Sequence, residues 1–583
     1  MNIVLKDGIC FELNDRNCTA KVSESPNARG DIFIPSSINY KTQDFVVISI
    51  KEKSFMNNNQ IKSINFQFDS RLQTIEKNAF AFSSLESLSI PSKVKELNYG
   101  WCRGTSKLIH ISISPNNHFF SYLNNSLIIG KSKLNETDFY DSIYFVRRDI
   151  NQVIIPSFIK YIKPFSFHQC NSLHKILFPT DSPIESIEKF AFNYSSIEYV
   201  SIPPNVKKIG GYSFCYCEKL AKVDFTINSE LTSLGKYSFS NSSIKSISIP
   251  NKIKRIGQYS FYHCEKLKNV YFSKGSEFLS KIERGLFSFS SIEYIKIPSS
   301  VVEIGEFSFY SCHNLRTIEF NKNSNLNSIG KEAFSNSSIE FISIPIHVKK
   351  IPECCFRNCK KLKTIIFSIN SELLSIEEEA FSNSSIEKVF IPSHVKKMGK
   401  NCFSYCDRLK TVEFSNDSEL EYISERAFYR SSIQMISIPK YVMKIEDFAF
   451  SFCDCLKVVE FYPNVDISVF SRNAFTYSFL DKIIGRSIKT NNLKMIGNNA
   501  VVEIYNDESN YEEFFENPDD LYHDYNKCNI VLSETCDFQC ISNCANLLLI
   551  NESRSIHKEQ KLFFLKSSYK DKDQLNMRYK NDF

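Results

Sequence analysis

The sequence predicts a repeat solenoid, mainly β, in which about nineteen coils with parallel strands and short turns stack on one another. Three observations predict this fold class. An Ile-Pro dipeptide returns every 47 or 48 residues, a Cys returns in the same register, and each unit divides into two similar halves. Such a fixed period is typical of one repeat array rather than of several globular domains. The prolines of the dipeptide are Pro156, Pro203, Pro250, Pro298, Pro345, Pro392 and Pro439.

The spacing of apolar residues within one half-unit explains how a coil is built. Side chains alternate between the two faces of an extended strand, so Ile342 and Ile344 point the same way, into the coil. Ile339 enters from the preceding turn, and a Phe before the strand fills the interior. One coil alone leaves these groups exposed, whereas neighbours stacked about 4.8 Å apart bury them. In the first halves this Phe recurs as Phe167, Phe214, Phe261, Phe309, Phe356, Phe403 and Phe450.

The full motif resembles a known repeat family. Residues 297–320 read Ile-Pro-Ser-x-Val-x-x-Ile-Gly-x-x-x-Phe-x-x-Cys-x-x-Leu-x-x-Ile-x-Phe, and the final apolar-x-x-apolar-x-apolar stretch is the strand signature of leucine-rich repeats. Over residues 30–485 the chain resembles the BspA-like family of leucine-rich-repeat surface proteins. The resemblance implies a right-handed stack of coils. It also implies a role in adhesion at a cell surface, since members typically act there.

Departures from the period suggest three parts. We expect an N-terminal β-rich cap over residues 1–30, the solenoid over 31–485, and a non-repeat segment over 486–583. That last segment has a mixed or helical composition, and we expect its final ~20 residues to be disordered. The interval from Pro91 to Pro156 is 65 residues, eighteen more than one unit. The excess predicts a β-hairpin insertion near residues 112–150, around an Asn-Asn turn. The insertion is either a binding loop or a packing decoration.

Charge and hydropathy exclude several classes of protein. The 71 basic and 65 acidic residues leave a net charge of +6, which does not indicate nucleic-acid binding. No run approaches the roughly 18 apolar residues of a membrane span. Asp7 stands where a signal peptide would continue its apolar core. Two locations are therefore expected from different observations. The family resemblance indicates the cell surface, whereas the missing signal peptide and membrane anchor indicate the cytoplasm.

The recurring cysteines are expected to be structural. Consecutive members lie two coils apart, about 9–10 Å, whereas a disulfide requires Cα atoms within about 7 Å. The aligned place in the other halves holds a small polar residue such as Ser337 or Ser384, which favours a hydrogen bond at a tight turn over metal or redox chemistry. The members are Cys170, Cys217, Cys264, Cys312, Cys359, Cys406 and Cys453.

Nothing in the sequence predicts a catalytic residue, a metal site or a cofactor. There is no Gly-rich phosphate loop, nucleophile elbow or His-Glu-x-x-His sequence. The C-terminal cysteines have helical spacing without the paired spacing of zinc ligands, so we interpret them as a buried stripe. They are Cys528, Cys536, Cys540 and Cys544.

The recurring Asn-x-Ser/Thr sequences lie in one repeated turn. Asn and Ser favour turns because their side chains bond to nearby backbone, so we interpret these sequences as turn chemistry rather than glycosylation sites. They include Asn193, Asn241, Asn336 and Asn383.

The outward strand positions form the candidate working surface. Basic residues in first halves alternate with acidic residues in second halves, which predicts ion pairs between neighbouring coils. Aromatic residues interrupt this pattern, and exposed aromatics are typical anchors of interfaces. The alternative is that they stack on one another to stabilise the sheet. The candidate binding residues are Tyr199, Tyr271, Tyr294, Phe341 and Phe390.

The sequence therefore predicts a non-catalytic protein that binds a protein or glycan partner, with adhesion as its setting. A cytoplasmic scaffold for protein–protein interaction is the main alternative. A solenoid enzyme acting on glycans is the third.

Overall fold

The computed structural model describes residues 2–133, 139–461, 470–471, 473–485 and 501–504. The chain divides into two units, Met1–Ser324 and Asn325–Phe583. It forms an all-β solenoid of about 19 turns with parallel strands, which confirms the predicted fold class. The expected C-terminal non-repeat segment, with Cys528 to Cys544, lies outside the described residues except for Val501–Ile504.

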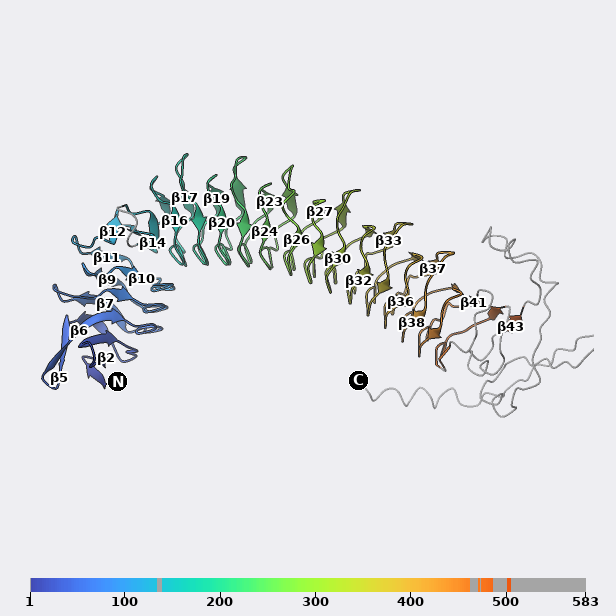
Figure 1. The fold of residues 1–583 in the computed structure, drawn as a ribbon, viewed down its shortest axis with the longest axis horizontal. Coiled ribbons are helices and arrows are strands. Elements are labelled where there is room, and N and C mark those ends of the chain that lie inside the picture. Colours follow the sequence, from blue (N-terminus) through green and yellow to red (C-terminus); the bar gives the residue numbers. More distant parts are fainter. Residues whose placement is uncertain (1, 134–138, 462–469, 472, 486–500, 505–583) are drawn as a thin grey trace, which may run out of the picture. The chain divides into compact units, whose positions relative to one another are not determined.

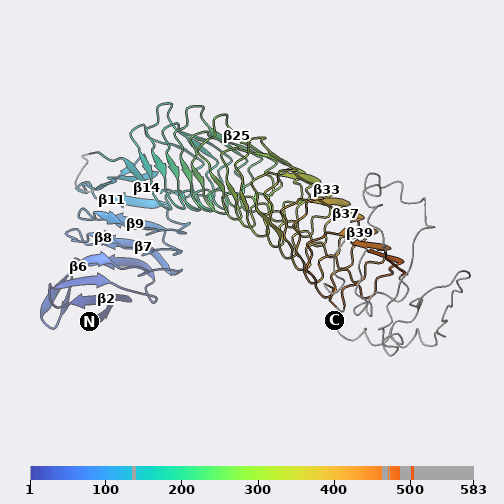
Figure 2. The same cartoon turned by 45° about the vertical axis from the view of Figure 1, so that its right-hand side comes forward.

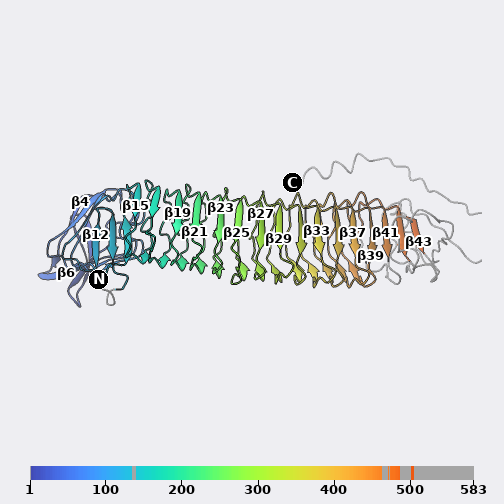
Figure 3. The same ribbon diagram turned by 90° about the horizontal axis from the view of Figure 1, so that it is seen from above.

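Most coils of the first unit contribute one long and one short strand, and most of these strands pair in parallel with their counterparts in the next coil (Figures 1 and 3). The long strands are β4 (Gly30–Ile34), β7 (Ile61–Phe66), β9 (Ser87–Ile90), β11 (His110–Ile113), β15 (Gln152–Ile154), β17 (Lys175–Leu177), β19 (Tyr199–Ile202), β21 (Lys222–Phe225), β23 (Ser246–Ile249), β25 (Asn269–Phe272), β27 (Tyr294–Ile297) and β29 (Thr317–Phe320). The short strands are β8 (Thr74–Ile75), β10 (Glu96–Leu97), β16 (Tyr161–Ile162), β18 (Ser186–Ile187), β20 (Lys208–Ile209), β22 (Ser233–Leu234), β24 (Arg255–Ile256), β26 (Lys281–Ile282) and β28 (Glu303–Ile304).

The N-terminal end of the first unit departs from this pattern. Strands β1 (Asn2–Lys6), β2 (Ile9–Asn14) and β3 (Thr19–Val22) form an antiparallel meander. Strand β3 then pairs in parallel with β6 (Gln43–Ile50), to which β5 (Ser37–Tyr40) adds antiparallel. The meander therefore covers the end of the short-strand sheet, where unpaired strand edges would invite aggregation.

The insertion between β11 and β15 begins as a hairpin. Strands β12 (Phe120–Leu123) and β13 (Leu127–Gly130) pair antiparallel, and β14 (Ser142–Val146) follows antiparallel to β13. Asn124 and Asn125 occupy the turn with φ of 50° and 49°. Asn tolerates this left-handed conformation better than most residues, which explains the Asn-Asn sequence. Strand β14 then pairs in parallel with β16, so the insertion joins the short-strand sheet.

The second unit repeats the same coil. Its long strands pair in parallel, as Figure 2 shows for β33, β37 and β39. They are β31 (Phe341–Ile344), β33 (Thr364–Phe367), β35 (Lys388–Ile391), β37 (Thr411–Phe414), β39 (Met435–Ile438), β41 (Val458–Phe461), β42 (Lys482–Gly485) and β43 (Val501–Ile504). Its short strands are β30 (Ser328–Ile329), β32 (Lys350–Ile351), β34 (Ser375–Ile376), β36 (Lys397–Met398), β38 (Tyr422–Ile423) and β40 (Lys444–Ile445).

The core of each coil is filled by one phenylalanine ring, as the repeat predicts. The seven phenylalanines from Phe167 to Phe450 in first halves are fully buried. Together with those of the second halves they form a continuous stack within each unit. Ring centroids are 4.4–5.6 Å apart in the first unit and 4.9–5.6 Å apart in the second. Because every ring packs on the two adjacent coils, no coil is stable without its neighbours.

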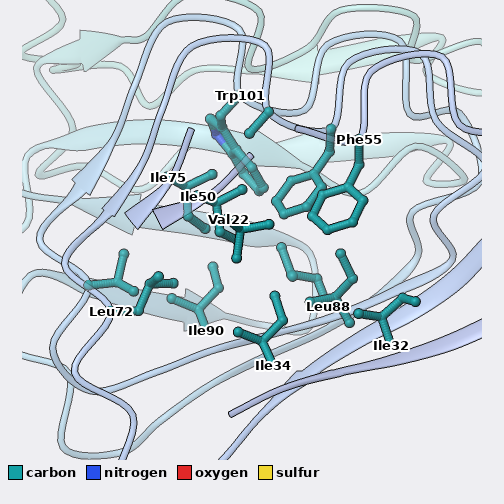
Figure 4. Packing of buried hydrophobic residues seen from close by; sticks show 14 of the residues in the cluster. Val22, Ile32, Ile34, Ile50, Phe55, Leu72, Ile75, Leu88, Ile90 and Trp101 are labelled. Carbon is teal, nitrogen blue, oxygen red and sulfur yellow. The ribbon is translucent and has the colours of Figure 1, made fainter. Parts of the chain in front are cut away.

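The same arrangement of apolar side chains begins near the N-terminus. Figure 4 shows Ile32, Ile34 and Ile90 from the long strands facing Ile50 of β6 and Ile75 of β8. Among the aromatic residues there, Phe80 stacks on Phe55 at 5.6 Å and meets Trp101 edge to face at 6.4 Å.

The turn that joins each short strand to the next long strand has an unusual backbone. Two residues per turn, four positions apart, have φ near +55°, and most of them are not glycine. Alternate N–H groups of the turn donate to the next coil: Phe190 to Gly211, Phe192 to Ser213 and Tyr194 to Cys215. These bonds satisfy the turn backbone and explain why the left-handed conformation recurs in coil after coil.

Candidate functional site

The predicted aromatic residues of the first unit lie on the outward face of the long strands. Tyr199, Tyr271 and Tyr294 are each more than a third exposed. Tyr294 lies opposite Asn269 of the neighbouring strand, so Tyr271, two residues further along that strand, belongs to a different outward row. Tyr199 lies on β19, and two long strands, β21 and β23, come between it and Tyr271 on β25. The structure therefore places them on one face but does not bring them together into a cluster.

The second unit carries apolar side chains on three successive long strands, where Ile366 and Phe390 share one outward row and Phe341 lies in the other. Phe341 lies opposite Thr364 and is 47% exposed, while Ile366, two residues after Thr364, is 49% exposed. Thr364 in turn lies opposite Lys388, which places Ile366 beside the half-buried Phe390. We call Phe341, Ile366 and Phe390 the apolar patch. Ile366 was not among the sequence-predicted residues, since only aromatic side chains were considered there.

Ion pairs join neighbouring coils beside the long strands of both units, in the alternation expected from the sequence. On the long-strand face His174 lies 3.2 Å from Glu198, Lys268 lies 2.9 Å from Glu293, and Lys457 lies 3.6 Å from Asp481. Next to the apolar patch, Lys388 pairs with Glu413. Each exposed pair contributes only about 0–1 kcal/mol, but together they neutralise the face.

Tyr294 has a polar anchor that the sequence did not predict. Its hydroxyl donates a hydrogen bond to Glu319 of the next coil, and the Lys296 ammonium binds the same carboxylate. The bond to Glu319 and partial burial raise the pKa of Tyr294 to about 12, while the bonds from Lys296 and Tyr294 lower the pKa of Glu319. The ring is therefore held in one orientation with its face available.

The seven recurring cysteines are buried, and in six of them the thiol donates to a carbonyl of the preceding coil. Cys217 donates to Phe192 at 3.1 Å, and Cys359 donates to Phe334 at 3.2 Å. A serine of the preceding coil contacts each of these thiols, for example Ser337 at 3.4 Å from Cys359. Cys170 instead accepts a hydrogen bond from the buried Arg148 at 3.4 Å. We call these seven residues the cysteine row.

The thiols of the cysteine row are unreactive at neutral pH. Burial raises the pKa of the Cys217 thiol to about 12 and that of the Cys359 thiol to about 11, so both remain protonated at neutral pH. Since the thiolate is the reactive form, these groups are poor nucleophiles and poor metal ligands. All cysteines among the described residues are free thiols.

The described residues contain no cluster of His, Cys, Asp and Glu that could hold a metal ion. His347 and His394, which occupy matching places in two units of the repeat, instead lie 2.9 Å from Glu372 and 3.0 Å from Glu419. Within the part of the chain that the structure describes, no helix has the length and apolar character required to cross a membrane.

The sequence interpretation missed an aromatic row along the turns of the first unit. Its rings occupy the first left-handed position of each turn and stack face to face, with centroids 4.7–4.9 Å apart. An aromatic residue two positions before each core Phe was the signal that would have revealed it. The members of this turn row are Phe165, Phe190, Tyr212, Tyr237 and Tyr259.

The Asn-x-Ser/Thr sequences also lie in these turns. Asn241, Asn336 and Asn383 hold the second left-handed position, with φ between 55° and 60°. Asn383 donates to the side chain of Asn358 at 2.7 Å, and Asn358 donates to Asn336 at 3.1 Å. Asn193 is buried and donates to the Cys215 carbonyl at 2.8 Å. These asparagines therefore contribute to the structure of the turns, through their left-handed backbone or their side-chain hydrogen bonds.

Comparison with known proteins identifies a repeat family. The sequence model of the BspA type leucine rich repeat region matches residues 31–150, 139–268, 232–363, 280–410 and 374–506. No curated protein matches the chain.

Three bacterial proteins of known structure are similar in fold. A leucine-rich repeat protein from Bacteroides ovatus is 22% identical, with 82% of this chain and 99% of that chain covered and a TM-score of 0.47. A leucine rich cell surface protein from Faecalibacterium prausnitzii is 22% identical, with 71% and 95% covered and a TM-score of 0.37. The pneumococcal vaccine antigen PcpA is 18% identical, with 86% and 99% covered and a TM-score of 0.32.

Proposed function

Because the chain belongs to the family of BspA-type leucine-rich-repeat proteins, we propose that it is a non-catalytic binding protein whose long-strand face engages a protein partner. The observation that carries the proposal is the apolar patch of Phe341, Ile366 and Phe390 on adjacent strands of the second unit. Exposed apolar side chains such as Phe341 and Ile366, beside the half-buried Phe390 on a rigid sheet, are typical anchors of a protein interface.

The surroundings of the patch favour a protein over a glycan. A sugar requires free hydrogen-bond donors and acceptors beside its apolar contact, but Lys388 and Glu413 next to Phe390 already bind each other. Ile366 offers an aliphatic surface suited to the apolar side chains of a partner. The paired charges around it form the polar rim that protein interfaces usually have.

Photo-crosslinking at the patch tests the proposal. A photoreactive phenylalanine analogue replaces Phe341 in one variant and the exposed turn residue Tyr405 in another, and crosslinked partners are identified by mass spectrometry. The affinity of the purified partner is then measured for the wild type and for F341S/I366S/F390S. The matched control is I369S/L374S/Y405S, which removes three exposed apolar side chains outside the long-strand sheet.

We expect a protein partner that crosslinks at position 341 and binds F341S/I366S/F390S at least about thirtyfold more weakly, since buried apolar anchors dominate interface energies. The control variant should bind as the wild type does. Crosslinking at position 405 alone, or equal losses in both triple variants, would refute the assignment of this face. Absence of any crosslinked protein would also refute it.

We further propose, from the resemblance to BspA-like surface proteins, that binding takes place at a cell surface. Protease treatment of intact source cells tests this location. Loss of the full-length protein without lysis supports adhesion, whereas complete protection supports an intracellular scaffold. A chromogenic glycoside panel tests the enzymatic alternative, for which we expect no turnover.

A further inference from the structure

Three consecutive coils of the first unit have a glycine directly after the short strand. Gly210, Gly235 and Gly257 follow β20, β22 and β24, and no other run of three occurs in the described part of either unit. Backbone of the adjacent coil fills the space that a side chain would need. A Cβ on Gly235 would lie 2.2 Å from the Gly211 nitrogen, and one on Gly257 would lie 2.4 Å from the Lys236 nitrogen. The three glycines therefore form a strip of bare backbone along the solenoid.

Gly235 and Gly257 of this strip line a hollow of about 390 Å³ that opens to solvent beside β20, β22 and β24. This volume lies within the range of about 300–1,000 Å³ typical of ligand pockets. The side chains that line the hollow are those of Lys208, Ser233, Leu234, Lys236, Arg255 and Gln258. In the flanking coils the glycine is replaced by Glu188 or Glu283, whose side chains end the strip.

The lining of this hollow is strongly cationic. Three of its side chains carry a positive charge and none is a carboxylate. The carboxylates at its two ends are occupied, since Glu188 lies 3.1 Å from Lys163 and Glu283 lies 3.2 Å from Nε of Arg255. Lys208 and Lys236 form no ion pair with any described residue, and Lys236 lies 5.8 Å from the Tyr212 ring of the turn row. Two lysines without an ion pair, together with Arg255, thus make the lining of the hollow positive.

We propose that this hollow binds an anionic oligosaccharide, with Lys208 and Lys236 holding its carboxylate or sulfate groups. Ser233 and Gln258 add the neutral hydrogen-bonding groups that sugar hydroxyls require. We call it the basic groove. It is separate from the apolar patch and adds a second ligand class to the proposed binding function.

The backbone of the groove favours a sugar over an acidic peptide or a nucleic acid. Gly235 N–H donates to Ile209 at 2.8 Å and Gly257 N–H donates to Leu234 at 2.9 Å, so the floor has no free edge for an added peptide strand. Single-stranded nucleic acids need exposed aromatic faces for base stacking, and the faces of Tyr212 and Tyr237 are covered by neighbouring rings. A sugar acid needs only the side-chain donors that are present.

Calorimetric titration of the full chain tests the basic groove. The probes are a tetrasaccharide of galacturonate, a sulfated tetrasaccharide, the neutral galactose tetrasaccharide, inorganic sulfate and a tetraglutamate peptide. The test variant is K208Q/K236Q, which removes two exposed charges without changing the glycine floor. Its control is K350Q/K397Q, which changes exposed lysines at the first position of β32 and β36, the place that Lys208 has in β20.

We expect one or both anionic tetrasaccharides to bind the wild type, and K208Q/K236Q to weaken that binding at least tenfold, because charge-assisted hydrogen bonds are the stronger ones. K350Q/K397Q should bind as the wild type does. The inference is overturned if no anionic tetrasaccharide binds, if the neutral sugar or sulfate alone binds equally well, or if the peptide binds more tightly. Equal losses in both double variants overturn it as well.

The result is independent of the proposed protein-binding function. F341S/I366S/F390S should bind the anionic tetrasaccharide normally, and K208Q/K236Q should bind the protein partner normally. Loss of oligosaccharide binding and loss of protein binding are therefore distinguished by which variant shows the loss.

Discussion

The thiol of Cys359 donates a hydrogen bond to the carbonyl oxygen of Phe334, 25 residues earlier in the chain and one coil away in space. The same bond recurs from Cys406 to Phe381 and from Cys453 to Phe428. The Phe334 carbonyl also accepts the Ser337 N–H of its own turn at 3.1 Å, so the thiol is a second donor that comes from the next coil. The cysteine row is thus a structural device that ties neighbouring coils together.

Replacing Cys359 with alanine should destabilise the second unit by about 0.5–1.5 kcal/mol, because the Phe334 carbonyl would lose one of its two donors and keep only the Ser337 N–H. Urea unfolding followed by circular dichroism measures this change. Cys455 is exposed, so Cys455→Ala is the matched control and should change the midpoint little. Equal effects of the two substitutions would show that the hydrogen bond contributes nothing.

Alkylation of the native protein should distinguish the cysteine row from exposed thiols. Burial raises the pKa of the Cys312 and Cys453 thiols to about 12, and both are inaccessible, whereas Cys455 is exposed. With iodoacetamide at neutral pH we expect Cys455 to react first and the cysteine row to react only after denaturation. Peptide mass mapping gives the rates. Labelling of Cys312 or Cys453 as fast as Cys455 would contradict the burial described above.

The left-handed turn residues lead to a third prediction. Asn401 has φ of 54°, a conformation that is strained for a β-branched residue and relaxed for glycine. Asn401→Val should therefore cost about 1–2 kcal/mol, and Asn401→Gly should be close to neutral. The neighbouring Lys400→Val, at a residue with negative φ, controls for the loss of a polar side chain. A neutral Asn401→Val in urea unfolding would mean that the turn relaxes readily.

Acid should destabilise the first unit through His168. This ring is buried, its Nδ1 lies 2.9 Å from the Asn193 carbonyl, and burial together with the charge of Arg148 lowers its pKa to about 3. In the unfolded chain a histidine titrates near 6.5, so the unfolded state binds a proton over the interval between these values. Stability is fully present above about pH 6.5 and falls by up to about 1.4 kcal/mol per unit as the pH decreases toward 3.

His168→Gln tests this assignment, because glutamine keeps a polar side chain but does not titrate. Urea midpoints at pH 7, 5 and 4 should decrease more steeply for the wild type than for the variant. Parallel decreases would assign the acid sensitivity to other groups.

The sequence by itself determined the coil and its period. The return of Phe356 and Cys359 after 47 residues identifies interior positions, since a side chain that faces the core of one coil must do so in every coil. The same logic places Ile342 and Ile344 inward and Phe341 outward, in agreement with their burial. The period is visible in the spacing of residues along the chain, so a single sequence was enough to predict the coil.

Only the tertiary structure decided which side chains meet. Coils differ by one or two residues in length, so the register that sets Ile366 beside Phe390 depends on how each turn closes. The turns use ordinary residues such as Tyr237 at positive φ, where composition would predict glycine, because bonds to the next coil outweigh the strain. The basic groove likewise depends on Gly235 and Gly257, which lie in adjacent coils, and contacts between coils are a property of packing rather than of any one segment.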